Sequence, residues 1–233
     1  MECDIFNFAE TSVNWKHVVP KENMIKPVKK KFPISRLNIG RNKFRSSQPT
    51  LPGGAAQVIA GDWTGRIVSY VHDSCQMRRW CGVKLRLKHN RNILIICAYR
   101  VCNQSLTQVG PETAYSQQKL MLTLDALSHT NPRDQFNDNF INSIKQWKHE
   151  YDDVLLVWDA NEPLANPQKV IVRLMHKCRL INLFHHHHGV CPSFPTYERG
   201  QQRLDYMIGC STLLPFITRC RYLPFFMGVQ TDH

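Results

Sequence analysis

Short apolar runs, separated by residues that favour turns, predict β-strands along most of the chain. Two of these runs, 92–99 (NILIICAY) and 153–158 (DVLLVW), are apolar on both faces, so we expect them to be central strands covered on both sides. Further strands are predicted at 4–9, 55–60, 66–72, 81–87, 180–184, 203–208 and around 218–223.

A helical spacing of apolar residues predicts a smaller number of helices. They are expected at 115–129, 136–149 and 168–178, with a short helical turn near 212–216. In the first of them Leu120, Leu124 and Leu127 lie on one face, and Pro132 stops the helix. Because strands alternate with only a few helices, the pattern indicates two packed sheets with helices outside, an α/β or α+β layered sandwich.

The length of 233 residues fits a single domain spanning 1–233. Within it, residues 16–50 are basic, lack a regular apolar pattern and are repeatedly interrupted by proline, so we expect a long surface loop. The segment 26–32 (KPVKKKF) resembles a nuclear import or phosphate-binding run, although lysines in a loop are more often simply solvated. The consecutive histidines 185–188 are expected on an exposed strand end, where alternating directions prevent them from sharing one metal ion.

The net charge of +12, from 30 Lys and Arg against 18 Asp and Glu, favours an anionic partner. The simplest such partner is a nucleic-acid backbone, and the alternative is a solvated basic surface. Nine cysteines form no CxxC pair and no zinc-type spacing, which favours small core residues in a reducing compartment. No secretion signal and no apolar stretch of roughly 18 residues is present. We therefore expect a soluble protein of the nucleus or cytoplasm, with no membrane segment and no obligate protein partner.

Polar residues follow the second central strand. Residues two apart in a strand point the same way, so Asp159 and Asn161 share a side and Trp158 takes the other. A carboxylate and an amide aimed together can hold one water molecule, accept its proton and fix its direction. The alternative is an Asx-rich turn that closes the strand.

A second carboxylate lies in the predicted strand 203–208 (RLDYMI), where Asp205 stands opposite an apolar face. A buried acid needs a partner, and His233 is one candidate. A carboxylate bonded to an imidazole favours the protonated ring, which would stabilise charge on a phosphate. A salt bridge from Asp205 to Arg203 or Arg199 is the alternative.

Glu10 ends the first predicted strand, and Asp232 precedes the terminal histidine. Oxygen ligands completed by water are how magnesium is usually bound, often with only one or two carboxylates. Tyr99, at the exit of the first central strand, could donate its hydroxyl to a phosphate. The alternatives are a cap or surface charge for Glu10 and a buried core residue for Tyr99.

Six segments, taken in order, resemble the endonuclease/exonuclease/phosphatase superfamily with its DNase-I-like fold, and most of all the endonuclease domains of retroelements and the apurinic/apyrimidinic endonucleases. PGGAAQVI resembles the family's glycine-led second strand. The other five segments carry the candidate site residues: DIFNFAET carries Glu10, CAYRVC carries Tyr99, VLLVWDANEP carries Asp159 and Asn161, RLDYMIGCSTLLP carries Asp205, and QTDH carries Asp232 and His233.

This resemblance implies a four-layered α/β sandwich and a DNA endonuclease of retroelement type. It implies Mg²⁺ at Glu10 and Asp232, with Mn²⁺ as a substitute, and in-line attack of water on a phosphodiester. The catalytic work would fall to Tyr99, Asp159, Asn161, Asp205 and His233. Arginines near predicted strand ends are the candidates for contact with the DNA backbone, namely Arg78, Arg79, Arg100 and Arg203.

The sequence departs from the family pattern at both ends. The family's opening strand, which carries an asparagine, and its closing strand after the histidine have no counterpart in these residues. We therefore expect a domain truncated at both ends that lacks the first and last core strands. Two other functions remain open: a phosphatase of the same fold acting on inositol phosphates or phospholipid head groups, and a non-catalytic nucleic-acid-binding remnant.

Overall fold

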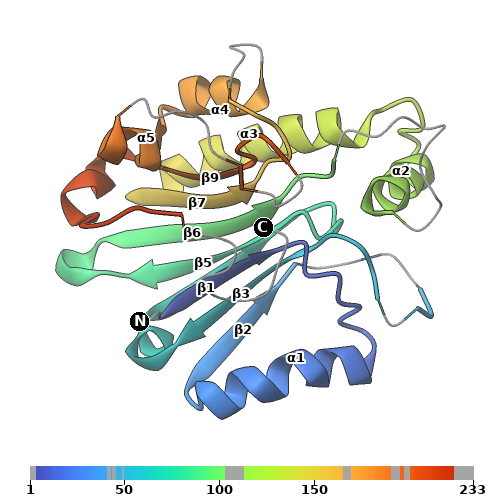
Figure 1. The fold of residues 1–233 in the computed structure, drawn as a ribbon, viewed down its shortest axis with the longest axis horizontal. Coiled ribbons are helices and arrows are strands. Elements are labelled where there is room, and N and C mark those ends of the chain that lie inside the picture. The colour runs from blue at the N-terminus through green and yellow to red at the C-terminus, as the bar shows by residue number, and fades with distance from the viewer. Residues whose placement is uncertain are drawn as a thin grey trace.

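Two β-sheets packed face to face form the centre of the protein (Figure 1). The computed structural model describes residues 4–40, 43, 46–48, 50–102, 113–164, 169–189, 195–196 and 200–222, with the side chains of 18–21 and 23 left out. Apolar side chains from both sheets meet between them, including Ile59 from one sheet and Val83 and Ile95 from the other.

The smaller sheet has three antiparallel strands in the order β1 (Ile5–Ala9), β3 (Ala55–Ala60) and β2 (Ser35–Ile39). Its middle strand, β3, is buried along its whole length, as expected of an apolar run. On the outer side of this sheet lies α1 (Val18–Lys31), and Phe32 at its end contacts Phe6 of β1 with ring centroids 5.0 Å apart (Figure 1).

The larger sheet has six strands, and its centre is the parallel pair formed by the two runs that are apolar on both faces. The predicted central strands are therefore confirmed. All its other pairs are antiparallel. In spatial order the strands are β4 (Ile67–His72), β5 (Trp80–Arg86), β6 (Asn92–Tyr99), β7 (Asp153–Asp159), β9 (Asp205–Gly209) and β8 (Ile181–Asn182).

Helices α3 (Pro132–Glu150) and α4 (Val170–Cys178) cover the outer face of the six-stranded sheet (Figure 1). Aromatic rings dominate this contact, since Phe136 and Phe140 of α3 pack on Trp80 and Trp158 of the sheet. With α1 on the opposite side, the layers run helix, sheet, sheet, helix. The expected α/β sandwich is confirmed. Two further helices are α2 (Ala114–Leu124) and α5 (Leu183–His188), and three short 3₁₀ helices span Gly61–Arg66, Lys88–Asn90 and Ser211–Phe216.

The prediction of a surface loop at 16–50 is wrong, because this segment contains α1 and β2. Pro20 obscured the helix in the sequence, yet it lies in the first helical turn, where N–H groups have no partner within the helix. Pro27 lies inside α1 and also argued against a helix from sequence. The strand β2 is short, and its pairing with β3 is a long-range contact that local pattern does not show.

The strand predicted at 180–184 is also mostly wrong. Only Ile181–Asn182 is extended, and the histidine run continues as helix α5. Asn182 caps this helix, because its side-chain oxygen accepts a hydrogen bond from the backbone N–H of His185. Of the strand expected around 218–223, residues 218–222 are described and form no strand.

The helix predicted at 115–129 ends earlier, at Leu124, and presents the opposite face to the core. Leu120, Leu124 and Leu127 are exposed, whereas Met121 and Leu122 are buried. Pro132 starts the next helix, with Asn131 as its cap. Among the described helices, none combines the length and the apolar composition needed to cross a bilayer.

Candidate active site

Three predicted site residues lie side by side across the central strands of the larger sheet. Tyr99 on β6 is the register partner of Asp159 on β7, and Asp159 is the register partner of Asp205 on β9. Residues paired across neighbouring strands point to the same face, so all three side chains form one row. Trp158 points to the other face, into the aromatic cluster under α3.

Glu10 reaches this row from the opposite sheet. It follows directly after β1, and the Tyr99 hydroxyl donates a hydrogen bond to its Oε1 over 3.1 Å. The contact needs Gly53, since a Cβ at that position would lie 2.8 Å from Cε1 of the Tyr99 ring. Residues 89 positions apart in the chain are thus joined where the two sheets meet.

A cleft with a volume of about 770 Å³ opens at this junction. Its polar lining includes three carboxylates, those of Glu10, Asp159 and Asp205. Its apolar lining includes Phe8 of β1 and Met24 of α1. Clefts with an apolar wall and a few convergent polar groups are the usual setting of an active site.

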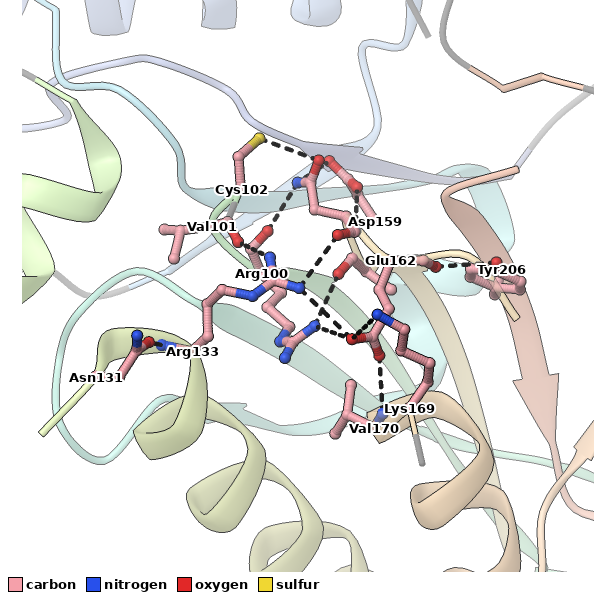
Figure 2. A network of polar contacts seen from close by, with 12 residues as sticks. Arg100, Val101, Cys102, Asn131, Arg133, Asp159, Glu162, Lys169, Val170 and Tyr206 are labelled. Carbon is pink, nitrogen blue, oxygen red and sulfur yellow. Dashed lines mark hydrogen bonds and ion pairs between the residues drawn. The ribbon is translucent and has the colours of Figure 1, made fainter. Parts of the chain in front are cut away.

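Asn161 lies in the turn that follows β7, and Figure 2 labels its neighbours Arg100, Cys102 and Asp159. Its backbone N–H donates to Oδ1 of Asp159 over 3.1 Å, which is an Asx turn. Its side-chain Nδ2 donates to the carbonyl of Arg100 over 2.7 Å and lies 3.3 Å from Oδ2 of Asp159. The carboxylate–amide pair and the turn, two alternatives in the sequence, are therefore present together.

The cleft also shifts the ionisation of its neighbours. Burial, and then the negative charge of Glu10, raises the pKa of Tyr99 well above its ordinary value, so its hydroxyl keeps its proton. Cys102, whose sulfur lies 3.1 Å from Oδ1 of Asn161, has its pKa raised to about 11 by burial and then by the charges of Glu10 and Asp159. Both shifts arise chiefly from burial, and the negative charge of Glu10 adds to each of them.

The donor set of the cleft suits a hard cation. Within the ranges that the structure describes, no group of three or more His, Cys, Asp and Glu side chains is arranged to hold a metal ion. Mg²⁺, however, is usually bound by one or two carboxylates with water. Glu10 lies in the cleft with two further acids, and carboxylate oxygens are the donors that Mg²⁺ prefers; the lining also includes the sulfur side chains of Cys97 and Cys220. Asp232, predicted as a second ligand, and His233, predicted as the partner of Asp205, lie outside the described residues.

The expected contacts of the four arginines with a nucleic-acid backbone are not supported, because all four side chains are buried. The fold uses their donors internally, to satisfy carbonyl groups and carboxylates that burial would otherwise leave unpaired. Arg78 donates to the carbonyls of Leu51 and Gly53, Arg79 pairs with Asp73 at 2.7 Å, Arg100 lies 3.3 Å from Glu162, and Arg203 donates to His185 over 2.7 Å.

The sequence analysis missed the charged side chains behind Asn161. Glu162, Arg133 and Lys169 gather there with Arg100 (Figure 2). The position of Glu162 directly after Asn161 was the one available signal. Nothing in the sequence places Arg133 or Lys169 beside it, since those contacts arise from the packing of α3 and α4.

No family model matches this chain, and no curated protein is similar enough in sequence to match it. Solved structures do match. The catalytic domain of APE2 from Xenopus laevis has a TM-score of 0.55 at 10% identity, covering 92% of this chain and 76% of that one. The human Nocturnin catalytic domain with bound sulfate has a TM-score of 0.54 at 11% identity, covering 89% and 69%. The 3′ phosphatase NExo from Neisseria, bound to a product DNA hairpin, has a TM-score of 0.53 at 14% identity, covering 91% and 78%.

These similarities show that the chain has the endonuclease/exonuclease/phosphatase fold, the DNase-I-like fold that the sequence motifs implied. Identities this low establish the fold alone. Nucleases and phosphatases both occur among the proteins of this fold.

Proposed function

We propose that this protein is a magnesium-dependent phosphodiester hydrolase that nicks DNA, of the retroelement endonuclease type. One observation carries the proposal: Glu10 from one sheet and Asp159 and Asp205 from the other line the same cleft, and Tyr99, the register partner of Asp159, donates to Glu10. Carboxylates gathered side by side in one cleft favour a bound cation.

The chain's own residues would activate and aim a water molecule. Asp159 would accept a proton from it, and the Asn161 amide, already held beside that carboxylate, would fix its direction. Tyr99 keeps its proton and donates it in a hydrogen bond to Glu10; donation to a phosphate oxygen of the substrate would replace that hydrogen bond. His233, supported by Asp205, is proposed to stabilise the charge that builds on the phosphoryl oxygens.

Glu10, together with Asp232, would hold the magnesium ion. The ion, when bound, polarises a phosphoryl oxygen and neutralises the leaving alkoxide. Glu10 also accepts a hydrogen bond from Tyr99, so Tyr99 holds the Glu10 side chain in position from the opposite sheet.

The net charge of +12 supports a polyanionic substrate. Affinity that comes from phosphate contacts falls steeply as salt concentration rises, whatever the base sequence. With the predicted arginines buried, exposed lysines such as Lys26, Lys30 and Lys31 of α1 are better placed for such contacts.

A phosphatase is the second candidate, favoured by the similarity to a 3′ phosphatase bound to a DNA product. Both candidates share the cleft and the attacking water, and they differ in whether the phosphate bears one ester bond or two. A substrate series from plasmid to a 3′-phosphorylated oligonucleotide and an inositol phosphate separates them.

The test is a nicking assay on supercoiled plasmid with Mg²⁺, run on the wild type and on Asp159→Ala. Asp62→Ala removes an equal charge from an exposed residue of a 3₁₀ helix and serves as the matched control. We expect nicking by the wild type and the control, none by Asp159→Ala, and none after chelation. Binding of plasmid without nicking identifies a non-catalytic binder, and turnover of small phosphate esters alone identifies a phosphatase; either result overturns the proposal.

A further inference from the structure

One carboxylate and three cations gather behind the turn that carries Asn161 (Figure 2). The carboxylate is Glu162, whose side chain is 8% exposed. Its Oε1 lies 3.3 Å from Nη1 of Arg100, 3.7 Å from Nη2 of Arg133 and 3.8 Å from Nζ of Lys169. Glu162 and its three cations form a charged cluster. This cluster and the row Tyr99, Asp159 and Asp205 meet at the turn that carries Asn161.

The other oxygen of Glu162 has a different task. Its Oε2 accepts the backbone N–H of Val170 over 2.8 Å, at the first residue of α4. An N–H at this position has no partner within its own helix, and a carboxylate is favoured there by the helix dipole. One side chain thus ties α4 to arginines that come from α3 and from the end of β6.

Those arginines in turn hold the backbone on both sides of Asn161. Arg133 donates to the carbonyl of Val101 over 2.5 Å and to the carbonyl of Asn161 over 3.2 Å. Arg100 lies 3.5 Å from the carbonyl of Ala160, and its own carbonyl accepts the Asn161 side chain. The contacts to the carbonyls of Val101, Ala160 and Asn161 are made by guanidinium groups, which must therefore stay in place behind the turn.

Asn161 depends on such support because its backbone conformation is uncommon. Its φ is +47°, in the left-handed region, which few residues other than glycine adopt and which asparagine adopts more readily than most. The amide is useful to Asp159 only while this conformation persists. A turn held only by its own Asx hydrogen bond would sample other backbone conformations.

Glu162 is the carboxylate that keeps the three positive charges of the cluster close together. Burial lowers the pKa of Arg100 to about 10, with the charge of Arg133 adding to the shift and Glu162 opposing it. Burial likewise lowers the pKa of Arg133, and Glu162 is again the first group that opposes the shift. Without the carboxylate, buried like charges would repel one another and separate.

We propose that Glu162 is a positioning residue: through Arg100 and Arg133 it fixes the left-handed turn at Asn161 and so orients the amide beside Asp159. The proposal deepens the proposed function and rests on it for its effect on turnover. The structural part, that Glu162 holds Asn161, can be tested without any activity.

Cys102 supplies that independent measurement. Its side chain is exposed, and its sulfur lies 3.1 Å from Oδ1 of Asn161. Loss of the Asn161 conformation removes this contact, so alkylation of Cys102 by iodoacetamide in the native state should speed up several-fold. Labelling is read by mass spectrometry of the Cys102 peptide, with the half-buried Cys75 in the same digest as the reference.

The variant is Glu162→Gln, which keeps an oxygen for Val170 and removes the charge. Asp153→Asn is the matched control, because it also removes a buried carboxylate paired with an arginine, at the opposite end of β7. We expect faster Cys102 labelling in Glu162→Gln and wild-type labelling in the control. Arg133→Lys, which keeps the charge but loses the forked contact, is the second variant if Glu162→Gln does not fold, and should also label faster.

In the nicking assay we expect Glu162→Gln to lower kcat about 100-fold at nearly unchanged KM, as for a small misplacement of a reacting group. In an Asn161→Ala background the same change should cost little more, since both act through one amide. Wild-type labelling of Cys102 in both folded variants would overturn the positioning role. Absence of nicking by the wild type, with faster labelling in the variants, would instead overturn the proposed function and leave the positioning role standing.

Discussion

Strand β7 has a buried aspartate at each end, and the two carboxylates have different neighbours. Asp153 at its start is 1% exposed, lies 2.5 Å from Arg91 and accepts a hydrogen bond from Thr212. Asp159 at its end is 3% exposed, yet its register neighbours are Tyr99 and another acid, Asp205. The same residue type, on the same strand, is neutralised at one end and surrounded by acidic and polar groups at the other.

The comparison separates a structural acid from a functional one by its neighbours. An arginine partner at Asp153 satisfies the charge within the fold, so this end requires nothing from outside. The Asp159 end gathers carboxylates from both sheets around one cleft, an arrangement that suits a bound cation. Functional sites often gather ionisable groups at some cost in stability, so we expect them to resemble the Asp159 end of β7.

The largest expected effect is on nicking. Asp159→Asn should reduce kcat by about 1,000-fold, the range expected when a general base is lost. Asp153→Asn, tested in the same assay at a temperature where it is folded, should keep wild-type kcat. The measurement is the initial rate of conversion of supercoiled to open-circular plasmid.

Equal losses of kcat in Asp159→Asn and Asp153→Asn would contradict the comparison. They would mean that β7 responds as one unit and that Asp159 has no special role. A normal rate for Asp159→Asn alone would remove Asp159 from the mechanism and require a different residue to activate water.

Stability should show the reverse ranking. Asp153→Asn weakens the contact with Arg91, which is 36% exposed and can be solvated, so it should lower the free energy of unfolding by about 1.5 kcal/mol. Asp159→Asn keeps an oxygen that can accept from Asn161 and removes one charge from a group of three carboxylates, so it should leave stability unchanged in the absence of metal. Urea unfolding with EDTA, followed by tryptophan fluorescence, gives both values; a larger loss for Asp159→Asn than for Asp153→Asn contradicts this ranking.

Much of this arrangement could be predicted from sequence, for a local reason. Asp159 and Asp205 stand in or at the end of strands whose apolar pattern is plain, so strand periodicity fixed the side to which each points. Glu10 and Tyr99 ended strands in the same way, and the structure joins them by a hydrogen bond.

What could not be predicted depends on long-range packing. The four arginines looked accessible because they flank strand ends, and only the folded chain shows that carbonyls and carboxylates enclose them. Helix α1 was hidden by two prolines whose tolerance depends on their place in the helix. The proposed role of Glu162 depends on its ion pair with Arg133, and sequence alone does not show that α3 places Arg133 beside it.

A smaller effect is expected from the two hydroxyl groups that donate hydrogen bonds to Glu10 and to Asp153. Tyr99→Phe removes the donor to Glu10 and should lower kcat/KM by about tenfold, since a hydrogen bond to a charged group contributes about 1.5 kcal/mol. Thr212→Val removes the corresponding donor at Asp153 and should leave kcat/KM unchanged. A magnesium titration of nicking by each variant checks this; equal behaviour of the two variants would show that Tyr99 has only a structural role.

The smallest effect is a pH dependence at the Asp159 end. The fold raises the pKa of Cys102 from 9.0 to about 11, chiefly by burial and then by Glu10 and Asp159. The folded state thus disfavours the thiolate, so the contribution of Cys102 to stability is complete below pH 9 and is lost as the pH rises toward 11. Cys102→Ala removes this loss, and its urea midpoint should gain on the wild type between pH 8 and pH 10.5. A difference between the two proteins that is the same at both pH values would mean that the fold does not raise the pKa of this thiol.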